Sequence, residues 1–240
     1  EANGEVFRLF TLDVGSGAGD VALIAADMVG PGGEVVGIDR NGAALALARA
    51  RAARVGFAHL TFREGDLADL APEWNFDAVV GRLVLMYMPD PAATLRALAG
   101  HLRRGGVVAF GEYNITPGPM RDPPAIPLTQ KLFGWIDGAF RHAGAETRMG
   151  DRLFLTFRKA GLPFPTLSLM SHMGGGPDWD GYAYAAATVR SLLPLILKAG
   201  LASEAEIGID TLEERLRAET TAANGVIRLP ELVNAWARVG

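Results

Sequence analysis

Three glycines at alternate positions, Gly15, Gly17 and Gly19, follow an apolar run and precede a helix-forming segment. Glycine has no Cβ, so its backbone can take positive φ and can approach a bound ligand closely. A second apolar run, 35–38, ends in Asp39, twenty residues beyond Gly19. That is the distance at which a βαβ unit returns an acidic side chain to a ribose. Together these residues predict a nucleotide-type site.

Acidic residues on both sides of this loop limit the kinds of ligand that it can bind. Asp13 precedes the loop, and Asp20 stands where the dinucleotide fingerprint G-x-G-x-x-G has its last glycine. A carboxylate at Asp13 repels a pyrophosphate but accepts hydrogen bonds from a cationic amino-acid group. The segment L-D-V-G-S-G-A-G resembles the S-adenosylmethionine site of class I methyltransferases. Within that family, the resemblance is to small-molecule methyltransferases of the ubiquinone and menaquinone type.

The resemblance implies S-adenosylmethionine as cofactor, with S-adenosylhomocysteine as product, and it assigns cofactor contacts to residues at strand ends. It implies that Asp39 holds the ribose hydroxyls and that the loop at Arg82 lies beneath the sulfonium. Plainer roles stay open, since Asp66 also fits a loop acid or helix cap and Arg82 a surface cation. The implied cofactor-binding set is Asp13, Gly15, Ser16, Gly17, Asp39, Arg40, Asp66, Leu67 and Arg82.

Methyl transfer from a sulfonium needs little beyond contact between nucleophile and methyl group, with a base where a proton must leave. Glu112 and His172 each follow a predicted strand, so both are candidate catalytic bases. Each also fits an ordinary hydrogen-bonding role. No His, Asp or Glu grouping has metal-ligand spacing, so we predict no metal. A serine hydrolase is unsupported because the chain lacks a G-x-S-x-G segment.

The composition of the chain limits its domain number, its partners and its cellular compartment. The 240 residues are 49% hydrophobic, which suits one α/β domain with an appended lid. A net charge of −4 without a basic block argues against nucleic acid or anionic membrane as partner. The chain has no cysteine for disulfides or thiolate zinc sites, no run near the roughly 20 apolar residues of a membrane span, and no signal segment at its start. We therefore expect a soluble cytoplasmic protein that acts on a small molecule, with a homodimer left open.

Short apolar runs alternate with helical segments along the chain. This pattern predicts an α/β fold, with a Rossmann-like, mostly parallel sheet, helices on both faces and ligands at the carboxyl ends of the strands. Expected helix caps are Asn41, Ser203 and Thr211. We expect strands near 12–14, 35–38, 59–63, 76–82, 107–110, 166–170 and 232–239, and helices near 21–29, 43–55, 91–103, 128–140, 151–159, 182–198 and 212–223.

Two segments rich in proline or glycine, 114–127 and 174–177, predict the hinges of a lid. Residues 1–240 then form a single methyltransferase domain with a core at about 12–112 and 151–240. The lid segments lie at about 113–150 and 174–223. Their aromatic residues predict an apolar, aromatic acceptor pocket, although each ring fits core packing equally well: Tyr113, Phe133, Trp135, Trp179, Tyr182 and Tyr184.

The predicted function is methyl transfer from S-adenosylmethionine to an oxygen, nitrogen or carbon nucleophile of a small apolar or aromatic molecule. One alternative is a protein that binds the same cofactor without transferring methyl, including a cyclase-like catalyst. A second is an NAD-dependent oxidoreductase. Asp13 and Asp20 beside the loop disfavour that enzyme, and so does the lack of a Tyr-x-x-x-Lys pair.

Overall fold

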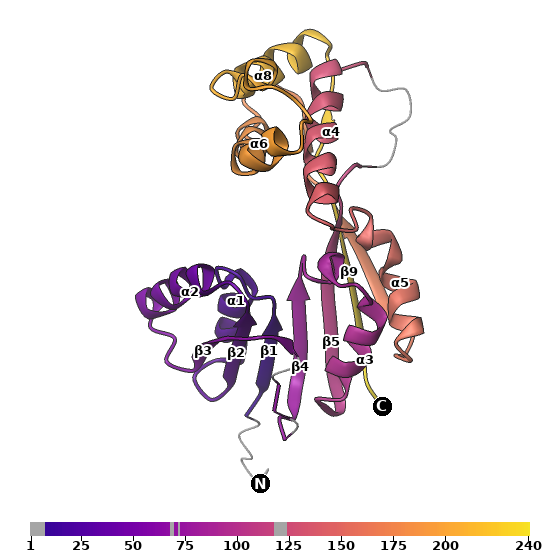
Figure 1. The fold of residues 1–240 in the computed structure, drawn as a ribbon. Coiled ribbons are helices and arrows are strands. Elements are labelled where there is room, and N and C mark those ends of the chain that lie inside the picture. The colour runs from indigo at the N-terminus through magenta and orange to yellow at the C-terminus, as the bar shows by residue number, and fades with distance from the viewer. Residues whose placement is uncertain (1–7, 68–69, 72, 118–123) are drawn as a thin grey trace. The chain divides into compact units, whose positions relative to one another are not determined.

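The structure is a computed structural model that describes residues 8–67, 70–71, 73–117 and 124–240 (Figure 1). The chain divides into two compact units. Unit 1 comprises Glu1–Glu112, Arg152–Ser168 and Asn234–Gly240, and unit 2 comprises Tyr113–Asp151 and Leu169–Val233. Residues 118–123 of the expected first hinge lie outside the described part of the chain.

A seven-stranded sheet organises unit 1, in the order β3-β2-β1-β4-β5-β9-β6. Strand β1 pairs in parallel with both β2 and β4, β2 with β3, and β4 with β5. The chain order therefore reverses between β1 and β4, where open α/β sheets bind ligands. This architecture confirms the predicted Rossmann-like, mostly parallel sheet. The strands are β1 (Phe10–Val14), β2 (Glu34–Asp39), β3 (Leu60–Glu64), β4 (Phe76–Arg82), β5 (Leu102–Asn114), β6 (Thr166–Met170) and β9 (Glu231–Arg238).

The helices of unit 1 begin and end with the local signals that the sequence carries. The Asn41 side chain accepts hydrogen bonds from the amides of Ala43 and Ala44, both at 3.1 Å, and so caps α2 as expected. Gly56 ends that helix with a left-handed φ of 78°. The elements are α1 (Asp20–Val29), α2 (Gly42–Val55), the short 3₁₀ turn η2 (Leu85–Tyr87), α3 (Pro91–Ala99) and most of α5 (Met149–Lys159).

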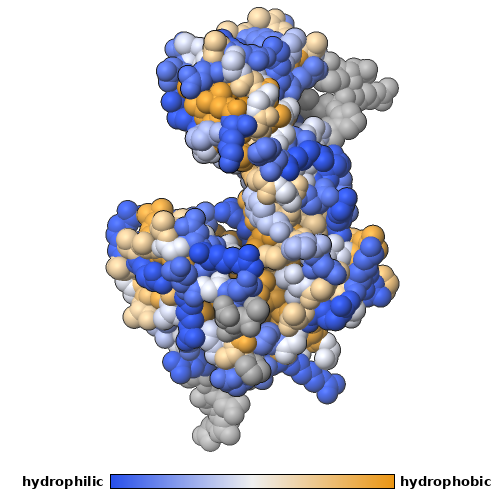
Figure 2. Space-filling model, in the orientation of Figure 1, coloured by the Kyte–Doolittle hydropathy of each residue, from blue (hydrophilic) through white to orange (hydrophobic). Residues whose placement is uncertain are grey.

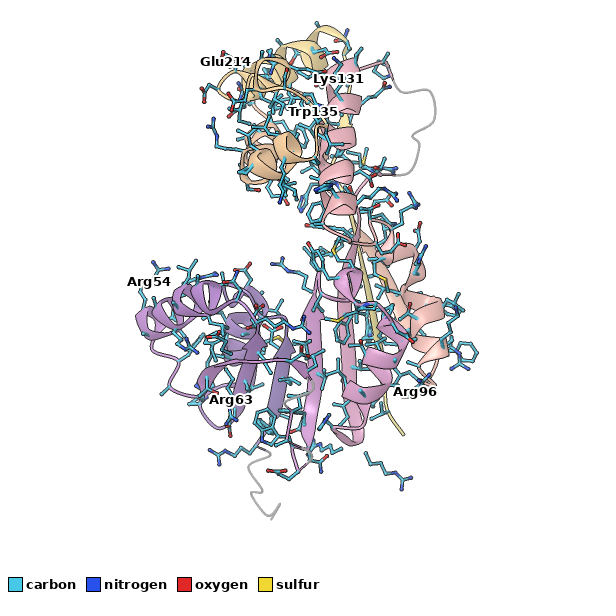
Figure 3. The ribbon with its side chains drawn as sticks, viewed as in Figure 1. Arg54, Arg63, Arg96, Lys131, Trp135 and Glu214 are labelled. Atoms are coloured by element: carbon cyan, nitrogen blue, oxygen red, sulfur yellow. The ribbon has the colours of Figure 1, made fainter. Side chains whose placement is uncertain are left out.

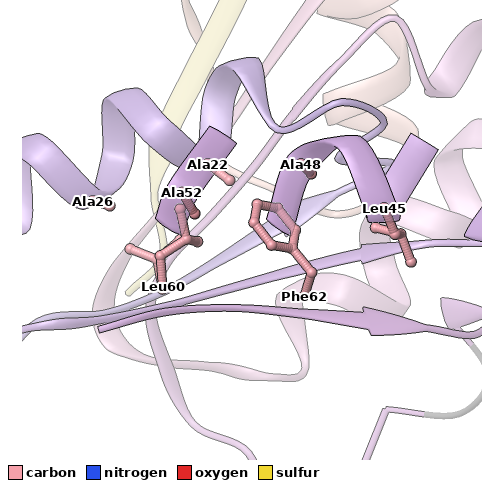
Figure 4. Close-up of a cluster of buried hydrophobic side chains, with 8 residues drawn as sticks. Ala22, Ala26, Leu45, Ala48, Ala52, Leu60 and Phe62 are labelled. Atoms are coloured by element: carbon pink, nitrogen blue, oxygen red, sulfur yellow. The ribbon is translucent and has the colours of Figure 1, made fainter. Parts of the chain in front are cut away.

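Part of the core lies between α1, α2 and strands β2 and β3 (Figure 4). Alanines on the inner faces of both helices let them approach the sheet closely. Phe62 on β3 lies directly under the glycine loop, because a Cβ on Gly19 would be 2.9 Å from its ring. This packing ties the position of the loop to the core. The cluster consists of Ala22, Ala26, Val35, Leu45, Ala48, Ala52, Leu60 and Phe62.

The predicted boundaries of α3 and β5 were wrong. The sequence predicted a helix near 91–103 and a strand near 107–110, but α3 ends at Ala99 and Leu102 begins β5. Gly100 follows the helix, and the carbonyl of His101 accepts the Phe76 amide at 2.7 Å. Pairing with β4 therefore starts before the Arg-Arg-Gly-Gly segment that was expected to end the helix.

Unit 2 is mainly helical, with α4 (Pro127–His142), α6 (Gly181–Lys198), α7 (Glu204–Ile207) and α8 (Leu212–Ala222). Helices α4, α6 and α8 contact one another, and Trp135 points from α4 toward the other two (Figure 3). A two-stranded antiparallel ribbon joins β7 (Met173–Gly174) to β8 (Ile227–Arg228). Ser203 caps α7 by accepting the Glu206 amide at 3.2 Å, as expected. Thr211 stands at the N-cap position of α8 as expected, but its side chain makes no capping hydrogen bond, because its hydroxyl donates to the Gly208 carbonyl instead.

Among the helices that the structure describes, none combines the length and apolar character needed to cross a membrane. On the face shown in Figure 2, hydrophobic residues of unit 2 gather among its helices within a largely hydrophilic surface.

Candidate functional site

The glycine loop after β1 needs glycine for its backbone conformation and for space. The φ angles of Gly15, Gly17 and Gly19 are 63°, 51° and 85°, all in the left-handed region. A Cβ on Gly15 would lie 2.6 Å from the Val84 side chain. The loop also joins the neighbouring strand, because the Ser16 amide donates to the Ile38 carbonyl at 3.0 Å. Its backbone is therefore closely packed between two strand ends.

Asp39, at the end of β2, holds the same loop from the other side. One carboxylate oxygen accepts the Gly17 amide and the other accepts the Asn41 amide, both at 2.8 Å. Asp39 is not the cap of α2, since Asn41 performs that role. A carboxylate offers about four acceptor sites, so two remain for hydroxyl donors of a ligand.

Asp13 is buried beneath the loop, with 1% of its surface exposed. Burial raises the pKa of its carboxyl to about 7, against the opposing effects of a hydrogen bond with the Ala22 backbone and of the nearby Arg82 charge. Its Oδ2 atom, like the Ser16 hydroxyl oxygen, has no hydrogen-bond partner in the described part of the chain. Buried polar atoms without partners are costly, so both atoms are candidates for contact with a polar ligand group.

A cavity of about 360 Å³ lies over these strand ends in unit 1, within the size range of small-molecule sites. Arg40 and Asp66 line it and form an ion pair with each other. It brings together five of the nine predicted cofactor residues: Gly15, Asp39, Arg40, Asp66 and Leu67. The other lining residues are Val14, Ile38, Gly65, Val84, Tyr87, Met88 and Pro89.

Sequence reasoning missed the wall that follows β4. Val84, Tyr87, Met88 and Pro89 are not among the predicted site residues, yet all four line the cavity. The available signal was the position of this apolar segment directly after a buried strand, at the edge of the sheet where the other site residues lie.

Arg82 is not among the residues that line this cavity. Its guanidinium pairs with Asp20 at 2.9 Å, and Asp20 also pairs with Arg51 at 2.7 Å. These contacts hold the pKa of the Asp20 carboxyl below its usual range, the Arg51 hydrogen bond contributing most. Asp20 opens α1, so the network joins that helix to α2 and to the end of β4.

Glu112 is fully buried, and backbone amides occupy its carboxylate. One oxygen accepts from Val84 at 3.0 Å and from Leu85 at 2.7 Å, while the other accepts from Met86 at 3.3 Å. Burial raises the pKa of its carboxyl to about 7 although these amides act in the opposite direction. The geometry fits a residue that positions the start of η2, and it leaves little capacity for accepting a proton from a substrate.

His172 lies in unit 2, between β6 and β7, and its side chain is exposed. It lines a cavity of about 330 Å³ together with Tyr113, Trp179, Asp180 and Tyr184. Two other aromatic residues of the expected lid, Trp135 and Tyr182, are buried in the helical core of the unit instead. No cluster suited to a metal ion occurs among the residues that the structure describes.

Comparison with known proteins decides the family. A family described as "Methyltransferase domain" matches residues 9–136, more than half of the chain. The chain belongs to this methyltransferase domain family. The match begins just before β1 and includes every residue of the unit 1 cavity. It confirms the resemblance carried by the L-D-V-G-S-G-A-G segment.

Relatives of this methyltransferase domain share part of their length with it. Arsenite methyltransferase of Aquipseudomonas alcaligenes is 37% identical over 42% of this chain and 32% of its own length. Ubiquinone biosynthesis O-methyltransferase of Alkalilimnicola ehrlichii is 41% identical over 44% of this chain and 42% of its own. The matches thus span less than half of these relatives.

Among solved structures, the domain is similar to phosphoethanolamine N-methyltransferase 2 of Haemonchus contortus, solved with phosphomonomethylethanolamine and S-adenosylhomocysteine. The TM-score is 0.59 at 18% identity, and the similarity covers 97% of this chain and 48% of the other. At this identity the similarity establishes a common fold.

Proposed function

We propose that the protein transfers a methyl group from S-adenosylmethionine to an oxygen, nitrogen or carbon nucleophile of a small molecule. The observation that carries the proposal is the unit 1 cavity, in which a left-handed glycine loop adjoins the Asp39 carboxylate above the buried Asp13. A buried carboxyl group with one oxygen lacking a hydrogen-bond partner, below a cavity of this size, suits a ligand with a nucleoside part and a cationic part.

The residues of unit 1 fit this cofactor group by group. Asp39 would accept the ribose hydroxyls on the lone pairs that Gly17 and Asn41 leave available. The Oδ2 atom of Asp13 would accept a hydrogen bond from the ammonium of the methionine part, with the Ser16 hydroxyl as a further polar contact. Apolar lining residues, Leu67 and Met88 among them, would exclude water from the adenine. Arg40 and Asp66 would flank the same group.

Arg82 and Glu112 would contribute by holding the chain that follows β4 in place. Arg82 would hold the turn after β4 by pairing with Asp20, and Glu112 would fix that turn through the amides of η2. When bound, S-adenosylmethionine supplies a methyl group on a positively charged sulfur, which makes the methyl carbon electrophilic.

The acceptor is proposed to be a small molecule that binds in the lid, the part of the chain that unit 2 represents. Support comes from two adjoining cavities in that unit, one of them apolar and aromatic. His172 is retained as a candidate base because its side chain faces one of these cavities. The proposed setting is the cytoplasm, without nucleic acid or membrane as partner, and a homodimer remains an open alternative.

Calorimetric titration with S-adenosylhomocysteine, S-adenosylmethionine and NAD tests the cofactor assignment. We expect the two sulfur compounds to bind and NAD to give no heat of binding. NAD binding without affinity for the sulfur compounds would refute the proposal in favour of an oxidoreductase. Release of S-adenosylhomocysteine with an acceptor separates a methyltransferase from a protein that only binds the cofactor.

A further inference from the structure

Unit 2 contains two cavities that share part of their walls. The first, which we name the polar cavity, has a volume of about 330 Å³ and includes His172, Trp179 and Asp180 in its lining. The second, the apolar cavity, has about 170 Å³ and lies among residues of α4 and α6. Because four residues line both, the cavities adjoin: Tyr113, Tyr184, Leu229 and Pro230.

The polar cavity contains a carboxylate and an imidazole, those of Asp180 and His172. Asp180 supplies a carboxylate, and no lysine or arginine appears among the described residues that line either cavity. The Asp180 carboxylate makes no hydrogen bond to the first turn of α6. Among the residues that the structure describes, the Asp180 side chain forms no ion pair and no hydrogen bond, so it is available to a ligand. A ligand carboxylate or phosphate placed beside Asp180 would meet repulsion without a lysine or arginine to compensate it.

Aromatic rings complete the polar cavity. Tyr113, Trp179 and Tyr184 line it together with Asp180. The Trp179 ring is held in place, because a Cβ on Gly174 or on Gly181 would lie only 2.3 or 2.1 Å from it. Tyr182 packs against the same ring edge-to-face at 5.0 Å. A fixed aromatic ring beside a carboxylate is an arrangement that attracts organic cations.

The adjoining apolar cavity offers a different environment. Leu132, Phe133, Ile136 and Phe140 line one wall from α4, and Ala185 and Thr188 line another from α6. This lining suits a hydrocarbon or aryl group of limited size, whose burial is favourable by about 25 cal/mol per Å².

We propose that these two cavities select a methyl acceptor with a cationic amine head and an apolar body, the head between Asp180 and the rings and the body in the apolar cavity. This inference rests on the proposed function, because it takes the ligand of unit 2 to be the methyl acceptor. It excludes acceptors that are recognised through a carboxylate or a phosphate.

Three probes of one shape test the charge preference on the full chain. Phenethylammonium, phenethyl alcohol and phenylacetate share a phenyl ring and a two-carbon chain but end in a cation, a neutral group and an anion. We expect the ammonium compound to bind about 3- to 10-fold more tightly than the alcohol, and phenylacetate to bind most weakly. Equal affinities, or preference for phenylacetate, would overturn the inference.

Two variants test whether the charge preference among the probes arises in the polar cavity. Asp180→Asn should remove the advantage of the ammonium over the alcohol while leaving alcohol affinity within about twofold. Asp178→Asn is the matched control, because Asp178 is an exposed acid two residues away that is not among the cavity residues. Unchanged selectivity in Asp180→Asn, or the same loss in both variants, would place the selection elsewhere and refute the proposal.

Titration of the same samples with S-adenosylhomocysteine distinguishes a failure of this inference from a failure of the proposed function. Binding of S-adenosylhomocysteine without a charge preference among the probes overturns the inference and leaves the proposed function standing. If the parent protein does not bind S-adenosylhomocysteine, the proposed function is overturned and, with it, the acceptor role of the cavities. Methyl transfer to an amine of this type, detected as released S-adenosylhomocysteine, supports both.

Discussion

Asp39 accepts two backbone amides, so its substitution affects both ligand binding and the loop. Asp39→Ala removes the proposed ribose acceptor and the support of the Gly17 amide. Taking roughly 1.5 to 3 kcal/mol for hydrogen bonds to a charged group, we predict about 10- to 100-fold weaker binding of S-adenosylhomocysteine by calorimetry. The fold should survive.

Asn41→Ala is the control for this experiment. It removes the cap of α2 and should cost about 0.5 to 2 kcal/mol in urea unfolding without changing affinity. An affinity of Asp39→Ala within about twofold of the parent protein would remove Asp39 from the site.

Asp13 makes stability depend on pH. Its folded-state pKa is raised to about 7 by burial, so the folded protein holds a proton that the unfolded chain releases near pH 4. The contribution to the free energy of unfolding is therefore full below about pH 4 and is lost as pH rises through about 7. Within this window the loss approaches roughly 1.4 kcal/mol per pH unit. Glu112, whose pKa is raised likewise, adds the same dependence.

Asp13→Asn should reduce this dependence to the part that Glu112 contributes, as measured by urea unfolding between about pH 4.5 and about pH 7.5, a range that covers most of the interval between the unfolded and folded pKa values. Asp27→Asn, at an exposed position on α1, should leave the slope of the parent protein intact. An unchanged slope in Asp13→Asn would show that the carboxyl is ionised throughout.

Glu112→Gln distinguishes a positioning residue from a catalytic base. A glutamine cannot accept all three amides of Val84, Leu85 and Met86, so the wall of the unit 1 cavity should loosen. We predict about 3- to 10-fold weaker S-adenosylhomocysteine binding, corresponding to roughly 0.7 to 1.4 kcal/mol. A base that touches only the acceptor would leave this affinity unchanged. Glu34→Gln serves as control, because Glu34 lies at the start of β2 and the unit 1 cavity lies at the other end of that strand, beside Asp39.

At the scale of elements, two glycines are predicted to respond oppositely to alanine. A Cβ on Gly37 of β2 would lie 2.6 Å from the Phe62 ring and 2.9 Å from the Ser16 hydroxyl. Gly37→Ala should therefore cost about 1 to 3 kcal/mol through overpacking. Gly134 lies exposed within α4 with nothing near its Cβ position, so Gly134→Ala should stabilise by about 0.5 to 1 kcal/mol.

Urea unfolding of both variants checks this pair of expectations. If Gly37→Ala were neutral, Phe62 would have to move without cost, and the close packing of the core under the glycine loop would be refuted. A loss in Gly134→Ala would instead indicate strain within α4.

At the scale of the whole molecule, the lid proposal predicts a ligand-dependent change in backbone protection. Residues 174–181 should exchange their amide hydrogens more slowly when S-adenosylhomocysteine and phenethylammonium are both present, because a lid must open for its ligand. The described parts of the first hinge, 114–117 and 124–127, should respond in the same way. The paired amides of β1 and β2 should be protected in both states. Equal protection of 174–181 in both states would argue against a lid.

Local signals in the sequence were enough for the family, the sheet class and part of the lining of the unit 1 cavity. Gly15, Gly17 and Asp39 act through backbone freedom and charge at a strand end, and such properties depend on the residue and its near neighbours. Asn41 and Ser203 likewise cap helices with their own side chains. Parallel strands bring their ends to one edge, so the unit 1 cavity could be anticipated from five residues far apart in the chain.

Tertiary structure alone decided which polar side chains remain available. Glu112 and Arg82 both stand at strand ends, but their partners come from segments distant in sequence: the amides of 84–86 for Glu112 and Asp20 for Arg82. Trp135 and Trp179 are equally aromatic in the sequence, yet one is core and the other lines a cavity. Hydrogen bonding and burial are settled by contacts between distant segments, and residue type and local spacing do not encode those contacts.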